Sequence, residues 1–266
     1  MINKTLFLRE SKAGLRLLLI FFAVLTMYAT MIIAMFDPKL GDSLTQMAQS
    51  MPTLFAAFGM LNVGATLGEF MGNYLYGFLL TVMPLIFVAM LANRLVVRYV
   101  ESGSMAYLLA TPNRRGRLVR TQALVLLTGT LLLLLLNLLV CIATAQAMFP
   151  GQLDVPAFLR LNVGLYGLHV FLGGLCFFAA CLFNDSRTSL GVGAGLGVLF
   201  LLVQMLSQVG DKFEVLKYAT PYTLFAPIGL LEGQGSAVAG MLCLYAVGAA
   251  LYAAAVAVFC KRDLPV

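Results

Sequence analysis

Residues 121–148 read TQALVLLTGTLLLLLLNLLVCIATAQAM, and this stretch decides the fold. It holds no charged side chain, and six consecutive leucines occupy positions 131–136. A helix that crosses the hydrocarbon core of a bilayer needs about 20 predominantly apolar residues. Only helices and closed barrels satisfy their backbone polar groups in lipid, so the stretch predicts a transmembrane helix.

Further apolar runs lie before and after this one, at residues 15–36, 72–97, 159–183, 189–209 and 237–260. Each of them is long enough to cross a bilayer. The second run contains Pro84, which membrane helices tolerate and which predicts a kink. We see neither an internal repeat nor a low-complexity linker. The pattern predicts one all-α integral membrane domain over residues 1–266, with six transmembrane helices.

The composition agrees with a membrane protein. Of 266 residues, 61% are hydrophobic and 11% are charged, whereas soluble domains average about 45–50% and about 25%. This balance argues against a soluble domain, a disordered chain and a disulfide-rich module. The five cysteines lie in or beside apolar runs without a CxxC pair, which indicates packing residues. Basic residues in the loops beside the membrane explain the net charge of +6. We therefore expect no nucleic-acid partner.

The basic residues predict how the chain is oriented. Six spans place both termini on one side, where the loops carry thirteen Lys and Arg residues against four on the other side. The thirteen are Lys4, Arg9, Lys12, Arg16, Arg94, Arg98, Arg114, Arg115, Arg117, Arg120, Arg187, Lys261 and Arg262; the four are Lys39, Arg160, Lys212 and Lys217. Positive charge accumulates in cytoplasmic loops, so we expect both termini in the cytoplasm and the chain in the cell (plasma) membrane.

Two connecting segments are expected to lie in or near the membrane surface. Residues 1–13 alternate apolar and basic side chains at helical spacing, which predicts an amphipathic interfacial helix. Residues 211–236 contain an apolar stretch that Pro221 and Pro227 interrupt. That stretch is too short to span the bilayer, so it predicts a re-entrant or interfacial segment between spans five and six. The external segment 37–71 receives no role.

Motifs of membrane enzymes are absent from the sequence. It contains no GxSxG, no HExxH and no GxxxxGK[ST], and its only histidine is His169. We therefore expect no catalytic residues, no metal site and no nucleotide site in this chain. The glycines at 191, 193, 195 and 197 lie inside a span and do not fit a phosphate-binding pattern, so we interpret them as packing residues.

Two sets of residues inside the membrane are candidates for function. Gly191 and Gly195, like Gly193 and Gly197, are four residues apart, so each pair lies on one side of a helix and permits close approach of another. That approach is either packing within the chain or a seam between two copies. The polar set is His169, Asn137, Asn162 and Gln204. Interhelical hydrogen bonding is the simpler role for each, and lining a transport pathway is the alternative.

Outside the spans, Glu69 and Glu232 near the outer ends form either a solvated rim or a site for cationic substrate. The high methionine and phenylalanine content favours amphipathic or hydrophobic cargo, such as a peptide, drug or lipid.

The connection between spans two and three contains the most informative motif, ESGSMAYLLATPNRRGRLVRTQ at residues 101–122. Residues 101–110 can form a short helix with an apolar side, followed by an arginine cluster. It either lies on lipid phosphates or docks into a groove of a soluble partner. The motif resembles the coupling region of type-two ABC transporter permeases. The amphipathic N-terminal helix, the proline-broken segment 211–236 and the ending FCKRDL are also similar to that family.

The resemblance implies a permease subunit of an ATP-driven exporter in a prokaryotic membrane. It implies a homodimer, or a pair with a similar permease, and two copies of a separate ATPase that carries the ATP and Mg. The N-terminal helix would be the family's elbow helix, and the glycine series would be a dimer seam. Docking residues would be Glu101, Met105, Leu108, Thr111 and Pro112, with a second contact at Asp185 and Arg187.

Two other classes remain as alternatives. An ion-gradient-driven secondary transporter would be self-sufficient, but such carriers often have inverted repeats and mid-membrane acidic residues, and neither is seen here. A membrane enzyme would need a nucleophile and a base, which the sequence does not provide.

Overall fold

A computed structural model describes residues 2–37, 50–51, 66–105, 114–209 and 211–262, and all regular secondary structure in these ranges is helical. Six helical segments are long and apolar enough to cross a membrane, which confirms the expected multi-pass fold. They are α1 (Lys4–Ala34), the segment Leu67–Glu101, α8 (Arg115–Met148), α9 (Val155–Leu182), α10 (Ser186–Ser207) and α12 (Gly235–Lys261). Segment Leu67–Glu101 consists of α4 (Leu67–Met71), the π-helix η2 (Gly72–Leu79), α5 (Leu80–Leu95) and α6 (Val97–Glu101).

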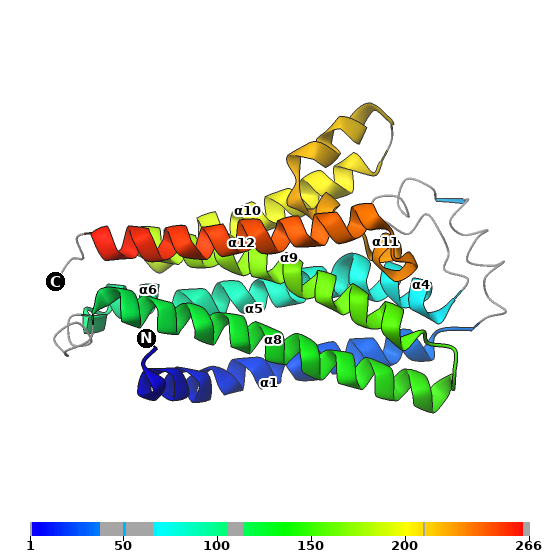
Figure 1. Cartoon of the computed structure of the whole chain (residues 1–266), viewed down its shortest axis with the longest axis horizontal. Helices are drawn as coiled ribbons and strands as arrows, with labels where there is room; N and C mark the ends of the chain where they lie inside the picture. The colour runs from blue at the N-terminus through cyan, green and yellow to red at the C-terminus, as the bar shows by residue number, and fades with distance from the viewer. Residues whose placement is uncertain (1, 38–49, 52–65, 106–113, 210, 263–266) are drawn as a thin grey trace.

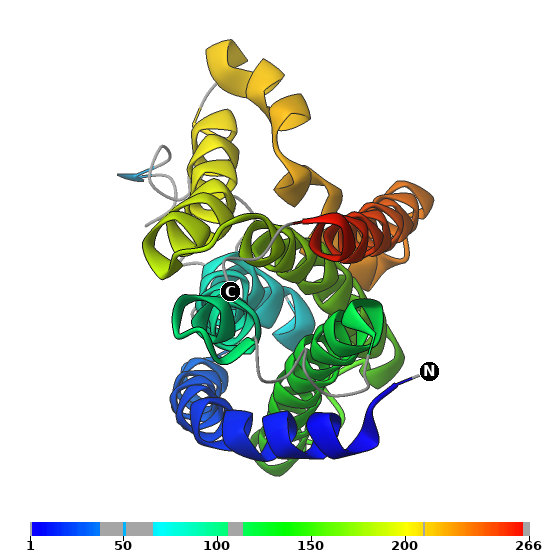
Figure 2. The same ribbon diagram turned by 90° about the vertical axis from the view of Figure 1, so that its left-hand side faces the viewer.

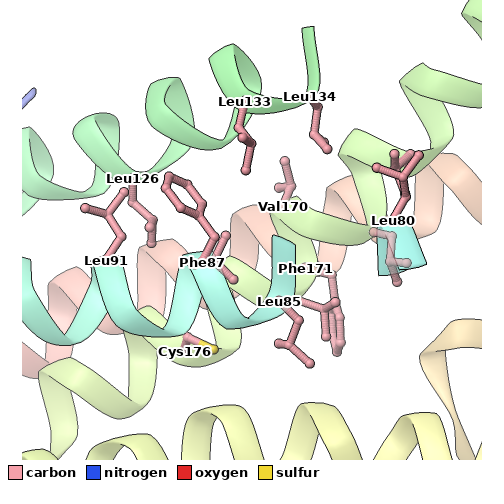
Figure 3. Packing of buried hydrophobic residues seen from close by; sticks show 14 of the residues in the cluster. Leu80, Leu85, Phe87, Leu91, Leu126, Leu133, Leu134, Val170, Phe171 and Cys176 are labelled. Carbon is pink, nitrogen blue, oxygen red and sulfur yellow. The ribbon is translucent and has the colours of Figure 1, made fainter. Parts of the chain in front are cut away.

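The long helices run along one axis, and α9 lies in the middle of them (Figure 1). It packs against α5, α8, α10 and α12, whereas α1 lies at the side of the bundle against α8 and α5. The core forms where α5, α8 and α9 meet, with Phe87, Leu126 and Phe171 among the buried side chains (Figure 3). Burial of apolar side chains between helices therefore centres on α9.

Most helices extend further into polar sequence than the apolar runs predicted. α8 begins at Arg115, six residues before the expected start at 121, because hydropathy marks the apolar part of a helix and not its hydrogen-bonded ends. Side-chain caps fix several of the starts. The side chains of Asn3, Asp154 and Asp185 accept backbone N–H groups in the first turns of α1, α9 and α10, respectively.

The irregularity expected at Pro84 lies upstream of the proline. Pro84 has no N–H, so the carbonyl of Leu80 loses its usual helical partner. The π-helix η2 ends immediately before Leu80, and the hydroxyl of Thr81 donates to the carbonyl oxygen of Tyr76 at 2.8 Å. A π-helical segment widens a helix and is frequent at functional sites.

The two connecting segments take helical forms. Helix α1 continues without a break from Lys4 to Ala34, and its first turns cross the other helices at the bottom of Figure 2. Residues 211–236 contain three short helices, η3 (Asp211–Ala219), η4 (Pro221–Leu224) and α11 (Pro227–Glu232). Helix α11 packs on α9, while η3 extends away from the bundle with Tyr218 83% exposed (Figure 1).

The start of α1 and the end of α12 lie at the same end of the bundle (Figure 1). The backbone N–H of Asn3 donates to Thr121 Oγ1, and Arg115 donates to the carbonyl oxygen of Arg262. This end, where α6 ends and α8 begins, also contains most of the arginines. We call it the basic end.

Candidate functional site

A hydrogen bond at the basic end joins two of the predicted contact regions. The hydroxyl of Ser186 donates to Glu101 Oε2 at 2.5 Å, across 85 residues of sequence. Glu101 ends the second span, and Ser186 is the first residue of α10, so the two connections expected in the cytoplasm meet at their ends. Met105 is buried against the core. Leu108, Thr111 and Pro112 lie outside the described residues.

The C-terminal end of α12 is bound to the same region. Arg262 donates hydrogen bonds to the carbonyl oxygens of Cys181 and Phe183 and to the side-chain oxygen of Asn184. Its own carbonyl oxygen accepts from Arg115 at 2.9 Å. These bonds connect α8, the α9–α10 turn and α12. We define the basic-end platform as Glu101, Arg115, Asn184, Ser186 and Arg262.

Asp185 and Arg187 have different roles beside this platform. The Asp185 carboxylate caps α10 by accepting the backbone N–H of Thr188 at 2.8 Å. That hydrogen bond is the largest of the causes that lower the pKa of Asp185 from 3.8, so the cap is ionised at neutral pH. Arg187 is exposed. Asp185 thus has a local structural role, although both it and Arg187 are exposed.

The four glycines of α10 divide between two environments. A Cβ atom at Gly193 would lie 3.0 Å from the Cys176 Cα, and one at Gly197 would lie 2.9 Å from a methyl carbon of Leu85. These two glycines therefore permit packing within the chain. A Cβ atom at Gly191 or Gly195 would meet nothing within 4 Å among the described residues. Only these two remain available to a second copy.

Three of the four polar candidates lie buried within the bundle. Asn162 accepts a hydrogen bond from the Tyr76 hydroxyl at 3.0 Å and donates to the carbonyl oxygen of Phe158 at 2.9 Å. His169 Nδ1 lies 2.9 Å from the carbonyl oxygen of Leu165, and Asn137 Oδ1 lies 3.7 Å from the Cys141 sulfur. Helix-to-helix and local hydrogen bonding accounts for Asn162, and none of the three lines the cavity described next.

Gln204 lines a cavity of about 200 Å³ at the end of the bundle opposite the basic end. Three parts of the chain enclose the cavity. They are η2 together with the start of α5, the last turns of α10, and the segment from η4 to α11. Gln204 Oε1 accepts a hydrogen bond from the Thr223 hydroxyl at 2.7 Å. The remaining wall combines rings, methyl groups and amides, and its members include Asn73, Tyr76, Phe78, Met205, Gln208, Tyr222 and Phe225. A site of this kind suits an amphipathic molecule. We call it the outer cavity.

Most of this wall has no direct signal in the sequence. Asn73 and Tyr76 reach it from a π-helix, which has no simple sequence signature. Thr223 and Tyr222 belong to the segment 211–236, whose prolines were the only available signal. Within the described residues, the buried hydroxyl of Tyr222 has no hydrogen-bond partner.

Glu69 and Glu232 line one hollow of about 210 Å³ together with Asp154. Each carboxylate already has a local partner. Glu69 belongs to the capping box of α4, Asp154 caps α9, and Glu232 accepts from the Gln234 amide at 2.7 Å. These roles account for the acidic residues without a cationic substrate.

No group of three or more His, Cys, Asp or Glu side chains that could hold a metal ion occurs in the described part of the chain. A comparison with protein-family models finds no match for this chain, and a comparison with curated proteins finds none either. The platform and the outer cavity are therefore the features of this chain that bear on its function.

Proposed function

We propose that this chain is the membrane-spanning permease subunit of an ATP-driven exporter of the type-two ABC class. Two such chains, or this chain and a similar one, form the pathway, and two copies of a separate ATPase bind at the basic end. ATP and Mg bind to the ATPase, and this chain needs no cofactor. The basic end faces the cytoplasm, because it carries the excess of arginine and lysine, and the chain resides in a prokaryotic cell membrane.

The observation that carries the proposal is the Glu101–Ser186 hydrogen bond. It attaches the predicted docking segment to the first residue of α10. Gln204, in the outer cavity, lies 18 residues further along the same helix, at about 27 Å for a rise of 1.5 Å per residue. A movement imposed at Glu101 is therefore transmitted along a single rigid element to the cavity wall.

The other parts of the bundle receive roles consistent with this arrangement. The first turns of α1 act as an elbow helix in the membrane interface, and residues 211–236 act as the re-entrant segment. Helix α10 is mostly exposed in the single chain, and Gly191 and Gly195 on its open side form the seam with the second copy. The outer cavity receives an amphipathic peptide, drug or lipid on its way out.

The test is co-purification through a tag on this chain, expressed with its genomic neighbours. We expect a separate ATPase to be recovered in stoichiometric amount with the wild-type chain. Glu101→Arg should lower that recovery by about tenfold or more, because a reversed charge at an interface costs several kcal/mol. Glu232→Arg is the matched control, since it makes the same change at the opposite end, and it should leave recovery unchanged.

Ser186→Ala separates coupling from docking. It removes the hydrogen bond to Glu101 and leaves the Glu101 carboxylate free to bind the ATPase. We expect normal ATPase recovery but reduced stimulation of ATP hydrolysis by cargo. Equal recovery with Glu101→Arg and wild type would contradict the docking role. A stable monomer without any ATPase would direct attention to the ion-gradient-driven carrier, for which flux under an imposed gradient is the assay.

A further inference from the structure

Three arginines surround a polar hollow at the basic end, between α1 and the α5–α6 junction. The hollow has a volume of about 340 Å³. Its wall consists of Arg9, Glu10, Ala13, Arg94, Arg98, Tyr99, Ser102 and Ser104. None of these residues belongs to the basic-end platform. We call this hollow the arginine pocket.

The arginine pocket carries positive charge that the described residues do not neutralise. Within the described residues, none of the guanidinium groups of Arg9, Arg94 and Arg98 makes a hydrogen bond or ion pair. One carboxylate, Glu10, faces them, and it accepts a hydrogen bond from the Tyr99 hydroxyl at 2.7 Å. Three cations against one anion leave the pocket able to bind a further negative charge.

The backbone brings neutral hydrogen-bond donors to the same place. Ser102 and Ser104 lie at the end of α6, on either side of Gly103, whose φ of +67° favours glycine. Their hydroxyl oxygens are 2.6 Å apart, and both hydroxyls donate long hydrogen bonds, of 3.5 and 3.4 Å, to the carbonyl oxygen of Tyr99, which a phosphate oxygen would replace as acceptor. Guanidinium and hydroxyl groups together are a typical environment for the oxygens of a phosphate.

An apolar groove lies next to the pocket and shares Glu10 with it. The groove, of about 230 Å³, runs between α1, α5 and α8. Its wall is mostly hydrophobic and includes Phe7, Leu15, Leu18, Phe87, Leu91 and Leu132. Thr128 and Gly129 open its α8 side. A charged pocket beside an apolar groove has the two-part character of a phospholipid.

We infer that the arginine pocket binds the phosphate of an anionic phospholipid from the leaflet at the basic end, with an acyl chain in the adjoining groove. Basic pockets between membrane helices on the cytoplasmic side are suited to anionic headgroups. The groove favours a lipid over a free phosphate, because only a lipid fills both spaces. The site depends on α1, α5, α6 and α8 of this chain and does not rest on the proposed export function.

The test is native mass spectrometry of the full chain in detergent, titrated with palmitoyl-oleoyl phosphatidylglycerol or phosphatidylcholine. We expect the first phosphatidylglycerol to bind tighter than phosphatidylcholine. Each single change, Arg9→Gln, Arg94→Gln or Arg98→Gln, should weaken phosphatidylglycerol binding about fivefold, and the triple variant should lose the preference. Arg114→Gln removes an exposed arginine at the same end and should preserve it.

Two further measurements distinguish the phosphate of a lipid from a free phosphate. Thr128→Phe fills the groove and should weaken phosphatidylglycerol binding about fivefold, whereas Leu139→Phe, on the exposed side of α8, should not. Glycerol phosphate at millimolar concentration should not displace the lipid. Displacement by glycerol phosphate would assign the pocket to a free phosphate and overturn the lipid inference. Equal phosphatidylglycerol binding by the triple variant and the wild type would overturn the site altogether.

Discussion

Helices α9 and α10 follow each other in the chain with nearly the same mean hydropathy, yet they lie in different surroundings. In the most apolar stretch of α9, 78% of the residues are buried by the rest of the chain, whereas in α10 the value is 22%. Hydropathy reports that both helices enter a membrane. Hydropathy does not show which helix lies in the middle of the bundle, because a helix that faces lipid and one that faces other helices are similarly apolar.

The two helices differ in what their glycines face. At Gly174 of α9, a Cβ atom would lie 3.0 Å from the carbonyl oxygen of Gly248 on α12 and 3.1 Å from the Leu251 Cβ. At Gly195 of α10, it would meet no atom of the described residues within 4 Å. Close approach of α9 and α12 thus requires the absence of a side chain, whereas the open side of α10 has no such requirement within one chain.

The largest expected loss of stability comes from placing a side chain at Gly174 of α9, compared with the same change at Gly195 of α10. Gly174→Val should lower the free energy of unfolding by about 1–3 kcal/mol, because the new methyl groups meet backbone and Leu251 that cannot all move away. Thermal unfolding of monomeric chain in detergent measures this. A thiol-reactive dye is a suitable probe, because Cys141, Cys176 and Cys181 are buried and react only on unfolding, whereas the exposed Cys243 and Cys260 give a constant background.

Gly195→Val is the matched control for that experiment. It should change the unfolding free energy of the monomer by less than about 0.5 kcal/mol. If α10 forms the proposed seam, the same variant should lower the dimer fraction in size-exclusion chromatography. Equal destabilisation by both substitutions would mean that α9 and α10 do not differ in packing as the structure indicates.

The sequence was sufficient to predict the number of spans and the approximate place of each. The leucine run at 131–136 and the five runs around it became helices, because a long uncharged segment has few other stable forms in lipid. The central position of α9 could not be predicted in the same way. It depends on which residues of each helix face a neighbour. On α10, for example, the pairs Gly191/Gly195 and Gly193/Gly197 have the same spacing, so the sequence does not show that only the second pair packs within the chain.

A smaller effect is expected from the polar groups of the two helices. Tyr76→Phe removes the hydrogen bond to Asn162 of α9 and should cost about 0.6 kcal/mol, the average for such bonds in membranes. Gln204→Ala on α10 should cost less, because its partner Thr223 also lies 2.7 Å from the carbonyl oxygen of Lys217. The same dye-based unfolding assay compares them. A larger loss for Gln204→Ala would reverse the ranking of the two helices.

The candidate site was only partly visible in the sequence. Gln204, Asn137, Asn162 and His169 are all polar residues at membrane depth in the sequence, but of these four only Gln204 lines the outer cavity. Whether a polar side chain faces a cavity depends on the partners across the bundle. The Glu101–Ser186 bond was also not predictable, because it joins residues 85 positions apart and neither residue type specifies the other.

The smallest expected effect concerns the starts of the two helices, since both are capped by an aspartate. Asp185→Ala should speed hydrogen exchange in the first turn of α10 more than Asp154→Ala does in α9. The first turn of α9 also contains Pro156, and its Ala157 and Phe158 are buried, so packing holds it without the cap. The first turn of α10 has exposed residues and depends on its cap.

The pH dependence of the α10 cap follows from the lowered pKa of Asp185. A carboxylate whose pKa is lower in the folded chain stabilises the fold above its ordinary pKa of 3.8 and loses that effect as the pH falls through the lowered value. Protection of the first turn of α10, corrected for intrinsic exchange rates, should therefore stay constant between pH 7 and pH 5. A loss of protection in that window would show that another group holds the start of α10, and the contrast with the packed start of α9 would then no longer depend on Asp185.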